Sequence, residues 1–319
     1  MHVRIALDLM GGDHAPKAPL EGAQIAAERD PEATLLLVGP ESVLLQVPSH
    51  PRLLPIPSGP GVPEGGQPAV YLRTHPDASM LRAVGLIAEG RADAAVSVGH
   101  TGALMIAARW RLGTVAGVAR PAPAAVFPLG SEPVVLDIGA NVDVAKRDYL
   151  AFAALGSAFA RVVKGVARPR VALLANGTER GKGTKLLKEA YTLLEANVPG
   201  FVGYVEPLEL FSGAADVVLA DGFLGNIVLK TMEGIAKTLL PLAGTAEGEL
   251  GRTLLRMADI TGSGSPILLL GTEGVVVPGH GRAVGEDLAR LVSLAAQAVR
   301  GGLLQAIRQE VAAFGLSDL

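Results

Sequence analysis

The stretch DVVLADGFLGN, residues 216–226, passes from an apolar strand through a glycine turn into the start of a helix. Four other stretches have the same design, at residues 10–14, 98–102, 138–141 and 176–183. Several of the strands are apolar at consecutive positions, which is typical of strands buried on both faces of a sheet. Because such strands alternate with helical patterns, the sequence predicts a mostly parallel α/β sheet covered by helices on both sides.

The hydrophobic periodicity also predicts where the individual elements lie. Strands are predicted at residues 3–8, 34–38, 94–98, 124–128, 133–138, 170–175, 201–205, 216–220, 266–270 and 274–277. Helices are predicted at residues 17–29, 79–90, 101–112, 147–164, 183–196, 225–239, 246–258 and 284–313. Residues 48–76 are rich in Pro, Gly and His, and we interpret them as a flap. No domain boundary is visible, so residues 1–319 are predicted to form a single α/β/α domain.

Residues 225–262 are predicted to form a protruding helical hairpin within that domain. Leu250, Leu254 and Met257 follow the i, i+4, i+7 spacing of one helix face. Such an apolar stripe is expected to pack on the protein's own core or on a second subunit. The alternative is contact with a membrane surface or an acidic partner.

Composition narrows the classes of function. The chain has 319 residues, 49% of them apolar, which is typical of a folded globular protein. Its net charge of −3 does not indicate the basic surface that nucleic-acid-binding proteins need. The lack of cysteine excludes disulfides and thiol chemistry. No signal peptide or membrane-spanning stretch is recognised, so a cytoplasmic protein, soluble or peripheral, is expected.

The glycine turns favour a binding site for phosphate. Glycine lets the backbone approach a ligand closely, and the helix that follows presents unpaired N–H groups that attract anions. Ligands of such sheets bind beyond the carboxyl ends of the strands, where these turns are predicted to lie. Lys182, among glycines just before a helix, is suited to phosphate, although a solvated loop lysine is the alternative.

Each polar residue of these turns can have a structural role, such as capping a helix, or a role in binding or catalysis. Asp13 can cap the helix at 17–29, and Thr101 can cap the helix that follows it. His14 can bind phosphate or act as an acid or base. Asn226 can be an N-cap or can donate to a developing oxyanion.

Several catalytic motifs are absent from the sequence. Residues 176–184 have Asn176 and Gly183 where a Walker A motif needs Gly and Ser or Thr. No glycine-rich nicotinamide fingerprint follows the first strand, and Ser97 and Ser212 are not in a nucleophile elbow. Asp137, Asn141 and Asp143 form a polar cluster without the regular spacing of metal ligands. We predict no cofactor and no resident metal.

Five stretches together resemble the phosphate acyltransferases of bacterial phospholipid synthesis, the acyl-carrier-protein:phosphate transacylases. They are LDLMGGDHAP at 7–16, VGHTGALM at 98–105, LDIGANVD at 136–143, GKG at 181–183 and DVVLADGFLGNIVLKT at 216–231. The resemblance implies a Rossmann-like α/β/α sandwich of the isopropylmalate-dehydrogenase and phosphotransacetylase type. It also implies a homodimer that associates peripherally with the inner face of the cell membrane, with a downstream acyltransferase as a further partner.

The activity implied by the resemblance is transfer of a fatty acyl group from acyl carrier protein to inorganic phosphate, which gives acyl phosphate. At the matching positions, Lys182 and Asn226 would be the catalytic pair. Phosphate would attack the thioester directly, with Lys182 orienting it and Asn226 donating to the oxyanion. The other residues expected to bind substrate are Gly11, Gly12, Asp13, His14, Gly99, His100, Thr101, Gly102, Asp137, Asn141 and Asp221.

Two other classes of function stay open at this point. One is a metal- and nicotinamide-dependent decarboxylating dehydrogenase of the same architecture, with Asp137, Asp143 and Asp221 as metal ligands. The other is a scaffold at a lipid surface that recruits partners through the helical hairpin and has no enzymatic activity.

Overall fold

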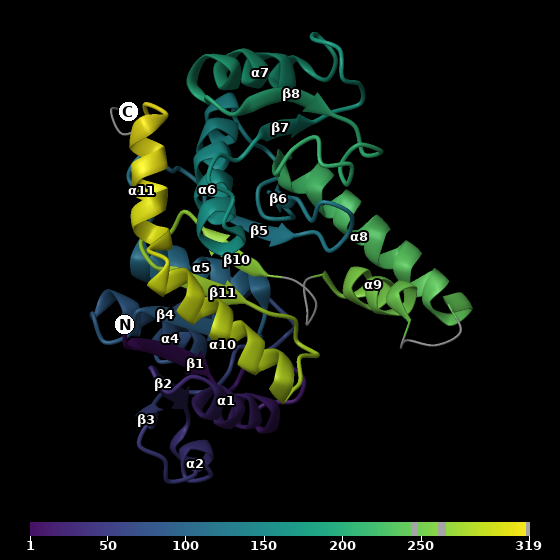
Figure 1. The fold of residues 1–319 in the computed structure, drawn as a ribbon. Helices are drawn as coiled ribbons and strands as arrows, with labels where there is room; N and C mark the ends of the chain where they lie inside the picture. The colour runs from purple at the N-terminus through teal and green to yellow at the C-terminus, as the bar shows by residue number, and fades with distance from the viewer. Residues whose placement is uncertain (244–247, 261–265, 317–319) are drawn as a thin grey trace. The chain divides into compact units, whose positions relative to one another are not determined.

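The computed structural model describes residues 1–243, 248–260 and 266–316. The chain divides into two compact units, each built from segments that are separated in the sequence (Figure 1). Unit 1 contains Met1–Thr114 and Thr272–Leu304, and unit 2 contains Val115–Gly271 and Gln305–Leu319. Both units are α/β structures, and the single domain expected from the sequence stays a prediction.

Unit 1 contains parallel strands in the order β3 (Leu53–Pro57), β2 (Ala33–Gly39), β1 (Val3–Asp8), β4 (Ala94–Ser97) and β11 (Val275–Pro278). Helix α1 (Lys17–Arg29) packs against α10 (Gly285–Arg300), and α4 (Ser79–Ala88) packs against α5 (Thr101–Leu112). The two helix pairs cover the two faces of these strands (Figure 1). Since β1, β4 and β11 are parallel neighbours, the turns that follow them lie at one edge.

Unit 2 contains strands in the order β10 (Ile267–Leu270), β5 (Ala122–Val126), β6 (Val134–Leu136), β9 (Val217–Leu219), β7 (Val171–Leu174) and β8 (Phe201–Val205). Strand β5 is antiparallel to β10 and β6, whereas β6, β9, β7 and β8 are parallel. Helix α6 (Lys146–Lys164) packs against α7 (Lys185–Asn197), and α8 (Gly222–Leu239) packs against α9 (Glu249–Ala258). The loops after β6, β9 and β7 therefore share one edge of this unit.

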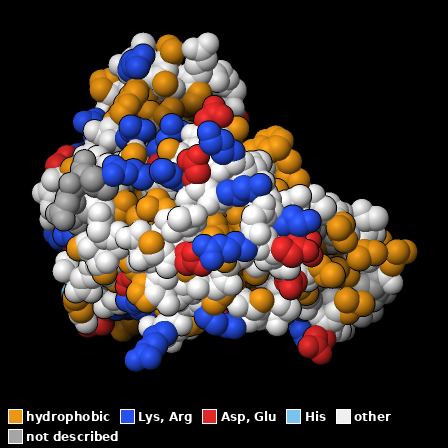
Figure 2. All heavy atoms as spheres, turned by 90° about the horizontal axis from the view of Figure 1, so that it is seen from above, with side chains coloured by type: hydrophobic (Ala, Val, Ile, Leu, Met, Phe, Trp, Pro, Cys, Tyr) orange, Lys and Arg blue, Asp and Glu red, His pale blue; other side chains and the backbone are white. Residues whose placement is uncertain are grey.

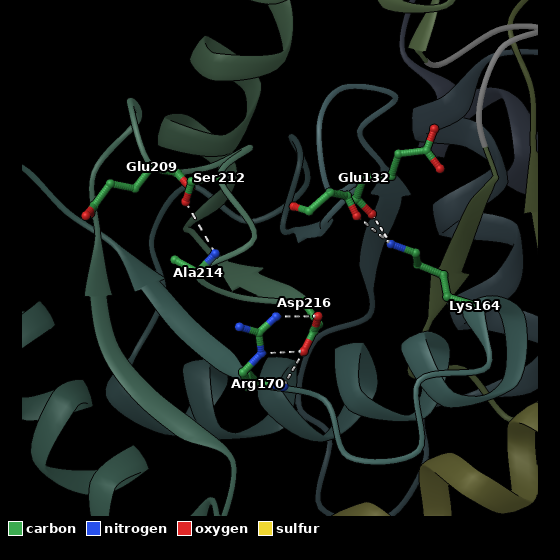
Figure 3. Close-up of polar contacts among 8 residues, drawn as sticks. Glu132, Lys164, Arg170, Glu209, Ser212, Ala214 and Asp216 are labelled. Atoms are coloured by element: carbon green, nitrogen blue, oxygen red, sulfur yellow. Dashed lines mark hydrogen bonds and ion pairs between the residues drawn. The ribbon is translucent and has the colours of Figure 1, made fainter.

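Charged side chains connect the segments at the other edge of the unit 2 strands, where β7 and β9 begin. Arg170, just before β7, donates from its backbone N and its Nε to Asp216, just before β9, at 2.8 and 3.0 Å (Figure 3). Burial raises the pKa of Asp216, but the hydrogen bonds from Arg170 outweigh burial and hold that pKa below its usual value. Lys164 at the end of α6 donates to the carbonyl oxygens of Ser131 and Glu132. These contacts fix the strand ends that lie away from the glycine turns.

All ten predicted strands are present, but two regions differ from the sequence-based prediction. The predicted flap at 48–76 contains β3 and a short helix, α3 (Pro68–Thr74). Strand β3 has the sequence LLPIP, and its prolines are tolerated because it lies at the edge of the sheet. The helix predicted at 284–313 is two helices, α10 and α11 (Leu303–Ala313), since Gly302 adopts a φ of 70° between them.

The predicted hairpin is present in its described part. Side chains from α8 and α9, among them Leu229, Met232, Leu254 and Met257, are buried in one core with strands of unit 2. Large hydrophobic residues are also exposed here: Ile235 and Leu239 on α8, Leu250 and Leu255 on α9, and Leu242 in the short 3-10 helix η1 (Leu240–Ala243). Figure 2 shows hydrophobic side chains gathered on this part of the surface. None of the described helices is long and apolar enough to cross a bilayer.

Candidate active site

The glycine turns of unit 1 pack directly against one another. A methyl group at Gly11 would lie 2.7 Å from the backbone N of Gly99, so the two turns approach as closely as only glycine allows. Gly12 has a φ of 89°, and the backbone N of Asp13 donates to the carbonyl oxygen of Gly281 at 2.7 Å. The turns after β1, β4 and β11 thus form one cluster, which brings together the residues that were expected from positions 11–14 and 99–102.

A buried carboxylate lies beneath this cluster. Asp8, 1% exposed at the end of β1, accepts hydrogen bonds from Ser79 Oγ at 2.6 Å and from Ser97 Oγ at 2.8 Å. It also accepts one from the backbone N of Met10, while Ser97 Oγ accepts one from the backbone N of Gly99. Burial raises the pKa of Asp8, and the hydrogen bonds oppose that rise. Asp8 therefore connects β1 and β4 to the start of α4.

The helix caps of unit 1 differ from the structural interpretations of the sequence. His100, not Thr101, is the N-cap of α5, because its Nδ1 accepts from the backbone N of Ala103 at 3.3 Å. Asp13 does not cap α1, which begins after Pro16 without a side-chain cap. Within the described residues, the backbone N–H groups of Thr101 and Gly102 have no hydrogen-bond partner. They are donors available to an anion.

In unit 2, the carboxylate of Asp137 organises the turn after β6. It accepts hydrogen bonds of 2.7–2.8 Å from the backbone N atoms of Gly139, Ala140 and Asn141, and from Nδ2 of Asn141. Asp137 is fully buried, and burial raises its pKa against the effect of these donors. Its oxygens are saturated by N–H donors, which is not the environment of a metal ligand. Contact of Asp137 and Asn141 with substrate stays a prediction.

This turn packs against the start of α8. A methyl group at Gly222 would lie 2.6 Å from the backbone N of Asn141, and one at Gly225 would lie 1.8 Å from the carbonyl oxygen of Asp137. Asp221 is the N-cap, because its Oδ1 accepts from the backbone N of Leu224 at 2.8 Å. The interpretation of position 226 as the N-cap is therefore wrong.

Asn226 is exposed in the first turns of α8 and lies beside the turn after β6. A methyl group at Gly139, whose φ is 147°, would be 3.6 Å from Asn226 Oδ1. Tyr149 Oη donates to Asp221 Oδ2 at 3.5 Å, and burial, followed by the charge of Asp221, raises the pKa of this tyrosine. Asp221 thus has both of its oxygens engaged within the protein, while the side chain of Asn226 is exposed.

Lys182 lies in the loop between β7 and α7. Its Nζ is 3.8 Å from Glu179 Oε2, and both side chains are more than half exposed. Gly177 lies under this pair, because a methyl group there would be 2.9 Å from Lys182 Cγ. Thr184 caps α7, so the loop ends in a helix N-terminus. Because β7 and β9 are parallel neighbours, the loop that contains Lys182 and the start of α8 that contains Asn226 lie at the same edge of unit 2.

Sequence reasoning missed the buried polar network of Asp8, Ser79 and Ser97. One signal was available: an acidic residue, Asp8, follows the apolar positions 5–7 at the end of a strand, shortly before a glycine turn. The serine that starts α4 is 71 positions from Asp8, and nothing in the sequence links the two. Across the described ranges, no group of three or more His, Asp or Glu residues is placed to hold a metal ion.

The chain is similar to known proteins over nearly its whole length. Residues 3–306 match the family model described as "Fatty acid synthesis protein". A phosphate acyltransferase of Desulforudis audaxviator is 41% identical over 96% of this chain and 95% of its own length. A phosphate acyltransferase of Halalkalibacterium halodurans is 38% identical over 97% of each chain.

The fold is also found among solved structures. A phosphotransacetylase from Streptococcus pyogenes superimposes with a TM-score of 0.63 over 94% of each chain, at 15% sequence identity. At that identity the likeness concerns the fold alone, and it confirms the predicted phosphotransacetylase-type architecture.

Proposed function

Since the chain belongs to the fatty acid synthesis protein family, whose relatives are phosphate acyltransferases, we propose that it transfers a fatty acyl group from acyl carrier protein to inorganic phosphate. The observation that carries this proposal is the family match over nearly the whole chain. The dehydrogenase alternative is not favoured, because those relatives are acyltransferases and Asp137 has its oxygens filled by N–H donors.

In the proposed reaction, an oxygen of bound phosphate attacks the carbonyl carbon of the thioester. The C–O bond forms, the C–S bond breaks, and the carrier's thiol leaves as a thiolate that takes a proton from solvent. A thiol has a pKa of about 8.5, so it is a good leaving group that needs little acid assistance. Phosphate is itself the nucleophile, which explains how a chain without cysteine can perform acyl transfer.

The roles follow from charge and exposure. The Lys182 ammonium orients phosphate and reduces its repulsion from the developing oxyanion, and the Asn226 amide donates to that oxyanion. In unit 1, the N–H groups of Thr101 and Gly102, which have no partner within the described residues, are donors suited to an anion. Asp8 and Asp137 position the turns through their hydrogen bonds, and the contact of Asp137 with substrate stays a prediction.

The proposal is tested by incubating the protein with an acyl-carrier-protein thioester and phosphate, followed by trapping with hydroxylamine. Formation of the acyl hydroxamate only when phosphate is present is expected. Release of free fatty acid at the same rate without phosphate would indicate a thioesterase instead.

Two features of the assembly are part of the same proposal. The exposed apolar residues of α8 and α9, such as Leu239 and Leu250, are suited to a homodimer interface or to peripheral contact with a membrane. Light scattering would report a dimer, and flotation with vesicles would report membrane contact. A Leu250→Glu variant is expected to lose at least one of these two properties. A downstream acyltransferase that receives the acyl phosphate is a further proposed partner.

A further inference from the structure

We propose that the C-terminal end of α5 in unit 1 is the surface on which an acidic face of the acyl carrier protein docks. This inference rests on the proposed function, because it concerns how the carrier-bound donor reaches the site. Three observations support it. The surface has arginines without an ion-pair partner among the described residues, and one of them contacts the exposed side chain of Trp110. The surface also lies on the same helix whose start is in a glycine turn.

The charge of this surface is positive. No acidic residue occurs between Ala94 and Thr114, whereas Arg109 and Arg111 lie in the last turn of α5. Arg73, at the end of the neighbouring α3, faces the same helix end. Within the described residues, no carboxylate is within ion-pair distance of Arg73 or Arg109. Unpaired arginines on a chain with a net charge of −3 favour an acidic partner.

Trp110, the single tryptophan of the chain, marks the centre of this surface. Its side chain is 43% exposed, and Arg73 Cζ lies 5.6 Å from the centroid of its ring. Exposed tryptophan and arginine together are the residues most enriched at the energetic centres of protein interfaces. The cation–π contact holds both side chains in place before a partner arrives, which reduces the entropic cost of binding.

The distance along α5 fits the carrier's prosthetic arm. Arg109 lies eight positions after Thr101, which begins α5 in the glycine turn, so about 12 Å of helix separate the two. A pantetheine arm has about 13 bonds between phosphorus and sulfur, which at backbone-like dimensions reach roughly 15 Å. Gly102, Met105 and Arg109 follow i, i+3, i+7 spacing along one helix face. A carrier docked at Arg109 can thus extend its thioester toward the N–H groups at the start of α5.

The test compares two donors that carry the same acyl chain, one on acyl carrier protein and one on free pantetheine. In Arg109→Glu and in Arg73→Glu, KM for the carrier-bound donor is expected to rise about fivefold or more, as for loss of an interface hot spot. KM for acyl-pantetheine and kcat for both donors are expected to stay unchanged. Equal losses with both donors, or no change with either, would overturn the proposal.

The matched control is Arg168→Glu, which makes the same charge change at an exposed arginine before β7, at the other edge of the strands of unit 2. It is expected to leave both KM values unchanged. Surface plasmon resonance with acyl carrier protein measures docking without turnover, so it separates this inference from the proposed reaction. Binding by the wild type that weakens with added salt and weakens in Arg109→Glu supports the surface, whereas equal binding by both proteins rejects it.

Discussion

Gly225 lies directly against the carbonyl oxygen of Asp137, so that a methyl group at position 225 would be 1.8 Å from that oxygen. The contact joins the start of α8 to the turn after β6. It explains why the motif requires glycine at this position although Gly225 is within a helix, where alanine is otherwise preferred. The position of Asn226, the next residue, depends on the same contact.

Gly225→Ala is therefore expected to destabilise the protein by about 1–3 kcal/mol or more, because the added methyl group must displace backbone rather than a flexible side chain. Acyl-phosphate formation is expected to fall as well, since α8 must move away with Asn226. Urea unfolding and the hydroxylamine assay measure the two effects. Gly234→Ala is the control, because Gly234 is in the same helix and its methyl group would meet nothing within 4 Å. That control is expected to gain about 0.5–1 kcal/mol.

Lys182→Ala is expected to lower kcat by about 10²-fold or more and to raise KM for phosphate, because the ammonium both binds phosphate and stabilises charge in the transition state. Stability should change little, since the side chain is 51% exposed. The control is Lys185→Ala, three residues further on, where the lysine is 93% exposed. Wild-type kinetics in both variants would contradict the role assigned to Lys182.

Asn226→Ala is expected to lower kcat by about 10²–10³-fold, the usual cost of removing one oxyanion donor, with little change in KM for either substrate. Asn197→Ala is the matched control, because Asn197 Nδ2 donates to the carbonyl oxygen of Leu193 on α7. A proportional loss in both variants would show that the asparagine acts through stability. A loss in KM alone at position 226 would make it a binding residue.

The sequence predicted the strands well because strands buried on both faces consist of consecutive apolar residues, such as Val217, Val218 and Leu219. It also located the glycine turns, since the reason for glycine there is a close approach of backbone. The edge strand β3 was missed because two of its residues are proline and its buried positions are few. Local pattern does not reveal that a segment completes the edge of a sheet.

The roles of the polar residues were harder to predict. Asp137 was considered as a metal ligand, yet its carboxylate is saturated by N–H groups of its own turn, while its contact with substrate stays a prediction. That outcome depends on the path of the backbone, which composition does not specify. The choice of His100 over Thr101 as the cap of α5 likewise depends on the φ and ψ angles at the turn.

The last prediction concerns the buried carboxyl group of Asp8 and the pH dependence of stability. Burial raises the pKa of Asp8 in the folded protein above its value of 3.8 in the unfolded chain. The folded state therefore binds the proton more tightly, and its contribution to stability is full below that unfolded value. The contribution is lost as the pH rises through the pKa of Asp8 in the folded protein. Above that pKa the buried carboxylate destabilises the fold, and its hydrogen bonds from the Ser79 and Ser97 hydroxyls reduce this effect.

Asp8→Asn removes this titration because the amide is neutral at every pH. The free energy of unfolding of the variant minus that of the wild type is therefore expected to increase with pH above about 4 and then to level off. Urea unfolding at a series of pH values measures this difference. The control is Asp93→Asn, because burial raises the pKa of the Asp93 carboxyl group but its contacts with Arg4 outweigh burial and lower it. For this control the difference should fall as the pH rises toward about 4 and stay constant above it, because ionised Asp93 stabilises the fold. A difference for Asp8→Asn that does not depend on pH would mean that Asp8 keeps one protonation state in the folded and unfolded chain alike, and that its role is purely that of a hydrogen-bond acceptor.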